Sequence, residues 1–203
     1  MSQKKTDPLN KLAGFLYEVG TLRKIPRAHM QSLLTHDLSD NIASHSHRVS
    51  VIGWFLAHEE GADPYKTVSM CLFHDISEAR SGDQNWLHKR YVKVFEDEIA
   101  RDQTSGLPKG NGISELIKEY RQRKTKEAIL VKDADLLDQI LLIKEYILQG
   151  NKEAEAWLKN GKGDNPNTHA KMLRSKTAKK LAKEIVRLWP GDWWKNLWTE
   201  TRR

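Results

Sequence analysis

Residues 69–83, SMCLFHDISEARSGD, place His74 and Asp75 side by side in an otherwise apolar segment, with Glu78 and Asp83 close behind. An unpaired buried carboxylate is costly, so such a segment needs either a solvent-facing side or a metal ion. At helical spacing, Glu78 lies on the same side as His74 and Asp75. Imidazole nitrogen together with carboxylate oxygen suits a borderline divalent ion such as Mn, Fe, Co, Ni or Zn. The segment therefore indicates a metal site or a solvated helix face.

A stable site needs more than two ligands, and two other segments offer candidates. His45 lies in ASHSHRVS at the start of an expected helix, on which His47 would point away from it. Asp133 and Asp135 lie in VKDADLLDQILL, just before a strongly apolar stretch. An acid there either stabilises the helix dipole or binds a metal, and the residues alone leave both explanations open. Asp133 and Asp138 are most simply surface charges, with Asp133 the substitute ligand if Asp135 is not one.

Helices are expected to position these candidates, because apolar residues recur at spacings of three and four along most of the chain. Asp63 and Pro64 have the residue types of an N-cap and a first helical position. The sequence shows no alternating strand pattern and no internal repeat. It therefore predicts an all-α protein. The expected helices span residues 9–22, 44–60, 64 to the RSGDQNW segment, 90–101, 113–122, 125–149 and 168–189.

Length and composition suit a globular protein with one sizeable core, since the 203 residues are 38% hydrophobic and 30% charged. No apolar run is long enough for a transmembrane helix, and the N-terminal residues lack the apolar core of a secretory signal. The single cysteine, Cys71, excludes an internal disulfide and fits a reducing compartment. We therefore expect a cytoplasmic protein.

The remaining histidines lie in polar contexts and are expected to be exposed; they include His29, His88 and His169.

The net charge of +7 is concentrated at the C-terminal end of the chain. Residues 171–203 hold ten Lys/Arg against three Asp/Glu, so the rest of the chain is balanced. Basic residues interleaved with tryptophan can bind single-stranded nucleic acid or a membrane surface. We prefer the simpler prediction that the tryptophans pack on the domain body or on a second subunit. The tryptophans of this tail are Trp189, Trp193, Trp194 and Trp198.

The order of the candidate residues resembles a known family. A single His45, an adjacent His74-Asp75 and a distant Asp135 resemble the ligand pattern of the HD-domain superfamily of metal-dependent phosphohydrolases. The segments HSHRVS, LFHDISEARSGD and KDADLL are similar to the branch of bacterial 5'-deoxynucleotidases and their eukaryotic relatives. The resemblance covers about residues 9 to 150.

This resemblance implies a helical bundle that binds one divalent metal ion (Mn, Co, Zn, Fe, Ni or Mg). Its implied catalytic residues are Glu78, as the proton-transfer group, and Asp83, which would orient the water or the phosphate. Arg27, in IPRAHM, would bind the substrate. The implied metal ligands are His45, His74, Asp75 and Asp135.

The chain departs from the branch at two positions that bear on the substrate rather than on the metal. Ser44 stands where an acid usually precedes the first histidine, and Ala28 stands where an aromatic residue often follows the arginine. The expected activity is that of a 5'-nucleotidase, releasing phosphate from (deoxy)nucleoside 5'-monophosphates with a water that the metal activates. The alternatives are hydrolysis of another phosphoester, such as a nucleoside triphosphate or an alarmone, and a non-catalytic protein that binds nucleic acid or another partner.

We expect the catalytic core to span residues 1–158 and a loop to follow at 159–168. Residues 169–203 would form a basic, Trp-rich helical extension that packs on the core or on a second subunit. The resemblance also implies a homodimer.

Overall fold

The computed structural model describes residues 7–159, 167–195 and 197 of the chain. These residues form helices joined by short loops and no β-strand, which confirms the all-α prediction. In chain order the helices are α1 (Pro8–Gly20), the 3-10 helix η1 (Thr21–Lys24), α2 (Met30–Leu33), α3 (Ile42–Glu60), α4 (Pro64–Phe73), α5 (Glu78–Ser81), α6 (Trp86–Tyr91), α7 (Glu96–Thr104), α8 (Gly110–Gln122), α9 (Lys126–Leu148), α10 (Lys152–Lys159), α11 (Asn167–Met172), α12 (Lys176–Arg187) and the 3-10 helix η2 (Asp192–Trp194).

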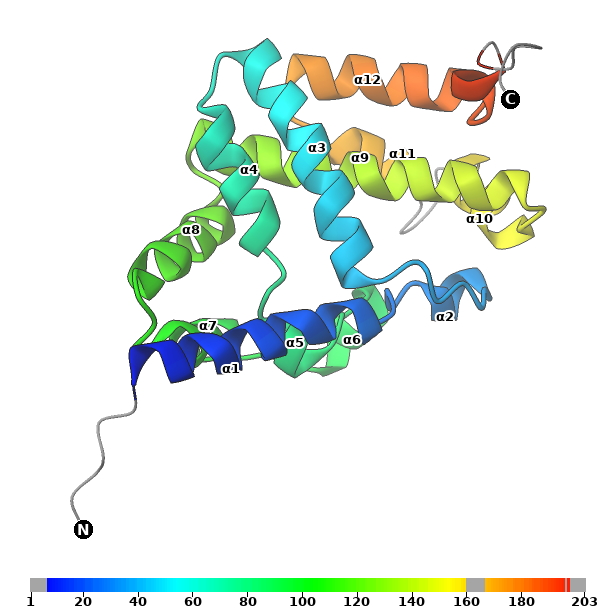
Figure 1. Ribbon diagram of the computed structural model, residues 1–203. Helices are drawn as coiled ribbons and strands as arrows, with labels where there is room; N and C mark the ends of the chain where they lie inside the picture. The colour runs from blue at the N-terminus through cyan, green and yellow to red at the C-terminus, as the bar shows by residue number, and fades with distance from the viewer. Residues whose placement is uncertain (1–6, 160–166, 196, 198–203) are drawn as a thin grey trace.

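Helix α9 is the centre of the bundle. Helices α3, α4, α8, α10, α11 and α12 all pack against it, and Figure 1 shows α3 crossing it. Its buried residues lie all around its circumference, which is the pattern of a helix that is enclosed by others. The main core therefore joins α9 to α3, α4 and α12. It includes Val49, Leu56, Met70, Leu130, Leu137, Ile140, Ala178 and Ala182.

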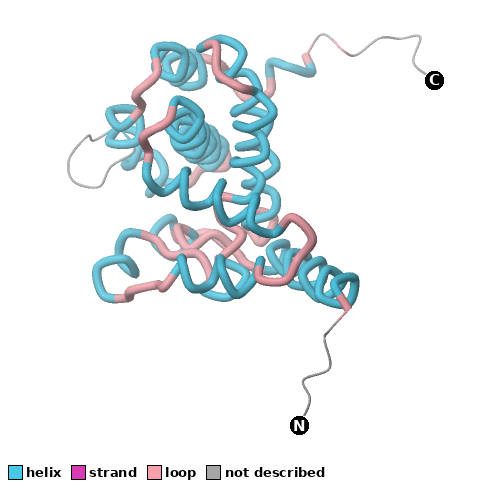
Figure 2. The backbone as a smooth tube through the Cα atoms, turned by 90° about the vertical axis from the view of Figure 1, so that its left-hand side faces the viewer, coloured by secondary structure: helices cyan, strands magenta, loops and turns pink. Residues whose placement is uncertain are grey.

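A second layer lies beneath this bundle and consists of α1, α5, α6 and α7 (Figures 1 and 2). It has a smaller core of its own, to which Phe15 of α1 and Ala100 of α7 contribute. Ile42, at the start of α3, and Ile76, between α4 and α5, are buried in the same core. The chain passes from the bundle to this layer between α4 and α5, so the His74-Asp75 pair lies where the two layers meet.

Close packing between α3 and α4 depends on Gly53. A Cβ atom at this position would lie 2.6 Å from Cys71 Sγ, closer than real contacts allow. Helix α4 begins as the sequence predicts, because the side chain of Asp63 accepts hydrogen bonds from the amides of Tyr65 and Lys66, and Pro64 takes the first position. The glycine therefore lets α4 approach the histidine-bearing helix α3.

The structure corrects the prediction that one helix carries His74, Asp75 and Glu78. Helix α4 ends at Phe73, tight turns follow, and the short helix α5 begins at Glu78. The His74 ring nitrogen Nδ1 bonds the carbonyl of Cys71 over 2.7 Å. In a continued α-helix that carbonyl would accept from the amide of Asp75, so the His74 side chain competes with the helix at this turn.

The helix expected over residues 168–189 is also interrupted. Helix α11 ends at Met172 and α12 begins at Lys176, with Leu173 buried in the main core between them. Ser175 caps α12, its side chain accepting from the amide of Ala178. The apolar face of α12 then packs on α9 and α3.

The tryptophans of the tail lie beyond α12 and are open to solvent in the single chain. Trp189, Trp193 and Trp194 are all exposed, while Trp198 lies outside the described residues. Their packing against a second subunit therefore stays a prediction. Across the described ranges, no helix has the length and apolar character that crossing a membrane requires.

Candidate metal centre

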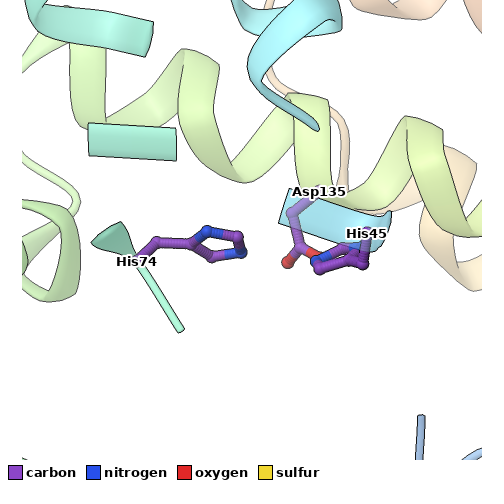
Figure 3. Close-up of side chains that lie close together, drawn as sticks. All are labelled: His45, His74 and Asp135. Carbon is purple, nitrogen blue, oxygen red and sulfur yellow. The ribbon is translucent and has the colours of Figure 1, made fainter. Parts of the chain in front are cut away.

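Three predicted ligands come from three different helical elements and meet at one point. His45 lies in the first turn of α3, His74 caps the end of α4, and Asp135 lies in the first half of α9. One nitrogen or oxygen of each lies within 4.8 Å of the others, and Figure 3 shows the His74 ring pointing toward Asp135 and His45. Asn41 and Ser44 fix the start of α3 with a capping box, so Ser44 has a local structural role.

Each histidine ring is held by a hydrogen bond on its outer nitrogen. His45 Nδ1 lies 2.6 Å from Asp138 Oδ2, and His74 Nδ1 lies 2.7 Å from the carbonyl oxygen of Cys71. Both Nε2 atoms are buried, and their polar neighbours are carboxylate oxygens of the same cluster, 3.1 Å away for His74 and 3.5 Å away for His45. A histidine that donates from one nitrogen to a carboxylate or carbonyl presents the other as a lone pair, which is the usual arrangement of a metal ligand.

Asp75 lies beside the same point. Its Oδ2 is 3.1 Å from His74 Nε2 and 3.5 Å from His45 Nε2, while Asp135 Oδ1 is also 3.5 Å from His45 Nε2. Burial alone would raise the pKa of Asp75, but His74 and His45 hold it well below its usual range. The four predicted ligands are therefore clustered, with two carboxylates available to balance a divalent cation. Unpaired imidazole nitrogens with carboxylates fit such an ion chemically.

The three other predicted site residues line a cavity that opens beside this cluster. Asp83 Oδ2 accepts from the amide of Ala28 over 2.7 Å and lies 3.3 Å from Arg27 Nε, so it fixes the loop that carries the arginine. Gly82, at φ 69°, makes the turn that leads from α5 to Asp83. The Arg27 side chain is 11% exposed; its Nε atom pairs with Asp83, while its Nη1 atom is buried without a hydrogen-bond partner. The arginine is thus held in place with donors left for an anionic ligand.

Glu78 supplies a carboxyl group of different character. Burial, the neighbouring Asp75 and then Asp83 raise its pKa well above its usual range. Its Oε2 atom is buried without a hydrogen-bond partner. A carboxyl group in this setting holds a proton more readily than an exposed one, which suits general acid or base chemistry.

Two further residues contact the cluster and were not predicted to do so. Asp138, expected at the surface, is buried and orients His45, while Arg48 forms an ion pair with the same carboxylate. Lys132 Nζ lies 2.6 Å from Asp135 Oδ2. The signal available in the sequence was spacing, because Lys132 and Asp138 lie three residues on either side of Asp135 and so on its face of the helix.

The structure also corrects three other surface assignments. Asp133, the substitute ligand, is buried away from the cluster, where it accepts from the amides of Arg174 and Ser175 and so stabilises the start of α12. His29 and His169 are buried rather than exposed. His29 Nε2 lies 2.6 Å from Asp40 Oδ2.

Comparison with known proteins identifies the family. The model of the HD domain family matches residues 19–179, most of the chain. The chain belongs to the HD domain family. Among solved structures, a conserved hypothetical protein of Pyrococcus furiosus is 26% identical, with a TM-score of 0.70 over 87% of this chain and 99% of that one. A protein of Magnetospirillum magnetotacticum MS-1, called a predicted metal-dependent phosphohydrolase, is 25% identical, with a TM-score of 0.66 over 92% of this chain and 95% of that one.

This HD domain protein also resembles a protein of Dictyostelium discoideum named 5'-deoxynucleotidase HDDC2. The two are 29% identical over 123 residues, which make up 54% of this chain and 64% of the relative. The chain thus spans just under two thirds of that relative's length.

Proposed function

We propose that this HD domain protein is a metal-dependent phosphohydrolase, a 5'-nucleotidase that releases phosphate from (deoxy)nucleoside 5'-monophosphates. The observation that supports this most directly is the convergence of the buried Nε2 atoms of His45 and His74 on the carboxylates of Asp75 and Asp135. The names of the relatives agree with it, since one is a 5'-deoxynucleotidase and another a metal-dependent phosphohydrolase.

The proposed ligands of one divalent ion are His45, His74, Asp75 and Asp135. When bound, such an ion lowers the pKa of water toward neutrality and neutralises charge on a phosphoryl group. Its identity among Mn, Co, Zn, Fe, Ni and Mg is open to experiment.

The other residues would bind the phosphate and move the proton. Arg27 lines the cavity and its Nη1 atom has no hydrogen-bond partner, and a guanidinium binds phosphate oxygens in pairs. Asp83 holds the arginine loop through the amide of Ala28. Glu78, with its raised pKa, would take a proton from the attacking water and give it to the leaving 5'-oxygen.

We further propose a cytoplasmic homodimer in which residues 1–158 form the catalytic core and 169–203 the extension. The exposed Trp189, Trp193 and Trp194 would lie at the subunit interface, because large exposed aromatic side chains commonly mark protein interfaces.

The proposal is tested with protein stripped of metal by a chelator. Phosphate release is measured from nucleoside mono-, di- and triphosphates after Mn, Co, Mg or Zn is added back singly. We expect release from monophosphates that depends on the added metal. Release from triphosphates alone would favour the other phosphoester class, and no release with any metal that the protein binds would contradict the proposed enzyme.

A further inference from the structure

The cavity beside the proposed metal ligands is larger than a phosphate group requires. Its volume is about 730 Å³, within the range of pockets that enclose whole small molecules. One part of its lining is charged and includes Arg27, Asp75 and Glu78. Another part is uncharged or aromatic and has no role in the chemistry described so far. It includes Trp86, Leu136, Gln139, His169 and Met172.

Two side chains of the uncharged part are buried with unused hydrogen-bonding atoms. Gln139 and His169 are each 7% exposed. The Nε2 atom of Gln139 and the Nδ1 atom of His169 have no hydrogen-bond partner in the structure. Leaving a buried polar atom unpaired costs about 1–3 kcal/mol, so such atoms usually have a partner. Because both residues line the cavity, a ligand can supply that partner.

Helix α9 sets the position of Gln139 and His169 relative to the proposed metal ligands. Gln139 follows Asp135 by four residues and so lies one turn further along the same helix. His169 belongs to α11, which packs against α9. A molecule with its phosphate at the cluster can therefore reach Gln139 and His169 within the same cavity.

An aromatic surface accompanies the two polar groups. The rings of Trp86 and His169 have centroids 5.5 Å apart and planes inclined at 42°. Trp86 is 40% exposed, so part of its ring is free to contact a ligand. Burial lowers the pKa of His169 to about 4, so its imidazole is neutral at physiological pH, with one donor and one acceptor nitrogen.

We propose that Trp86, Gln139 and His169 form a subsite that binds the base of the nucleotide. A base has flat faces that stack on aromatic rings, and edges that carry donors and acceptors for an amide and a neutral imidazole. These three side chains are neutral, and apart from Arg27 the lysines and arginines that line the cavity are Lys89, Arg121, Arg123 and Lys132. This inference rests on the proposed nucleotidase function and adds the residues that distinguish a nucleotide from a sugar phosphate.

The test compares substrates with and without a base. The values of kcat/KM are measured for the four 2'-deoxynucleoside 5'-monophosphates and for 2-deoxyribose 5-phosphate, using the wild type, Gln139→Leu and His169→Phe. Gln149→Leu, at the exposed end of α9, is the matched control. Circular dichroism establishes that each variant is folded.

We expect the wild type to prefer its best nucleotide over the sugar phosphate by about 100-fold or more, and each variant to reduce that preference by about tenfold, as the loss of a hydrogen bond to a substrate does. The value for 2-deoxyribose 5-phosphate should stay within about twofold. The subsite would be overturned if kcat/KM fell equally for the nucleotide and for 2-deoxyribose 5-phosphate. It would also be overturned if both variants kept the wild-type preference for the nucleotide. If one variant does not fold, Trp86→Leu, at a part-exposed position, carries the same expectation.

The subsite and the proposed function fail in different ways. If the wild type hydrolyses none of these compounds, the function is wrong, and the subsite is then tested by equilibrium dialysis of the four deoxynucleosides. Binding that Gln139→Leu weakens about tenfold supports the subsite. Absence of binding to the wild type overturns it.

Discussion

His45 and Asp138 join α3 to α9 through a hydrogen bond of 2.6 Å between Nδ1 and Oδ2. This bond holds the His45 ring so that its Nε2 atom points toward Asp75 and Asp135. Arg48 pairs with the same carboxylate from the outside. The charge of Asp138 thus acts on the proposed metal ligand His45, although Asp138 is not itself one of the proposed ligands.

Asp138→Asn should therefore weaken metal binding by about 10–100-fold, the usual cost of losing a carboxylate that supports a ligating histidine. Isothermal titration of the metal-free protein with Mn or Zn measures this change. Glu145→Gln is the matched control, because Glu145 pairs with Arg48 on the same helix face and does not touch His45. Unchanged affinity in Asp138→Asn would show that the hydrogen bond has no role in binding the ion.

Glu78→Gln should retain the metal and lose about 10²–10⁴-fold in turnover, because the amide fills the same space but cannot transfer a proton. Metal content and phosphate release are measured on the same sample. Glu59→Gln, at an exposed position of α3, should leave both unchanged. Near-wild-type turnover in Glu78→Gln would remove Glu78 from the proposed mechanism.

Arg27→Lys should lower kcat/KM by about 100-fold or more, since an ammonium group keeps the charge but loses the paired donors of a guanidinium. Steady-state kinetics with the best monophosphate measures this loss. Arg80→Lys is the control, because Arg80 pairs with Glu18 at the surface. Equal rates in Arg27→Lys and the wild type would mean that Arg27 does not bind the phosphate.

Asp133→Ala should destabilise the fold by about 2 kcal/mol and leave metal affinity unchanged, because the lost carboxylate bonds two amides at the start of α12 rather than the ion. Urea denaturation gives the free energy of unfolding. Asp102→Ala, where the side chain is 73% exposed, should change it little. Loss of metal in Asp133→Ala with full stability would restore Asp133 as a ligand.

The buried His169 predicts a pH dependence of stability. Its pKa is about 4 in the folded chain, because burial disfavours the charged ring, against about 6.5 when unfolded. As the pH falls below 6.5 the unfolded state binds the proton first, so stability is lost progressively until the folded pKa is reached. Between pH 7.5 and pH 5 the wild type should lose about 2 kcal/mol more than His169→Asn.

Urea denaturation at the two pH values, with a chelator present, measures this difference. His47→Asn, at an exposed histidine on α3, should follow the wild type. Parallel losses in the wild type and His169→Asn would show that the ring is not held neutral by burial.

The sequence by itself determined the helical class and the types of residue that form the proposed metal site. Helical periodicity depends on neighbours along the chain, and Asp63-Pro64 starts α4 through bonds within its own first turn. The order His45, His74-Asp75 and Asp135 is likewise a property of the chain. It indicated the family, and the structure brings these four residues together.

Only the tertiary structure decided which aspartates belong to the proposed metal site and which stabilise the fold. Asp133, Asp135 and Asp138 lie within six residues of one another on α9, yet the first binds the amides that precede α12, the second faces the histidines and the third orients His45. Their roles depend on which helix each side chain meets, and those helices are distant in sequence. The burial of His169 has the same cause, since the polarity of its sequence neighbours gives no information about the cavity against which α11 folds.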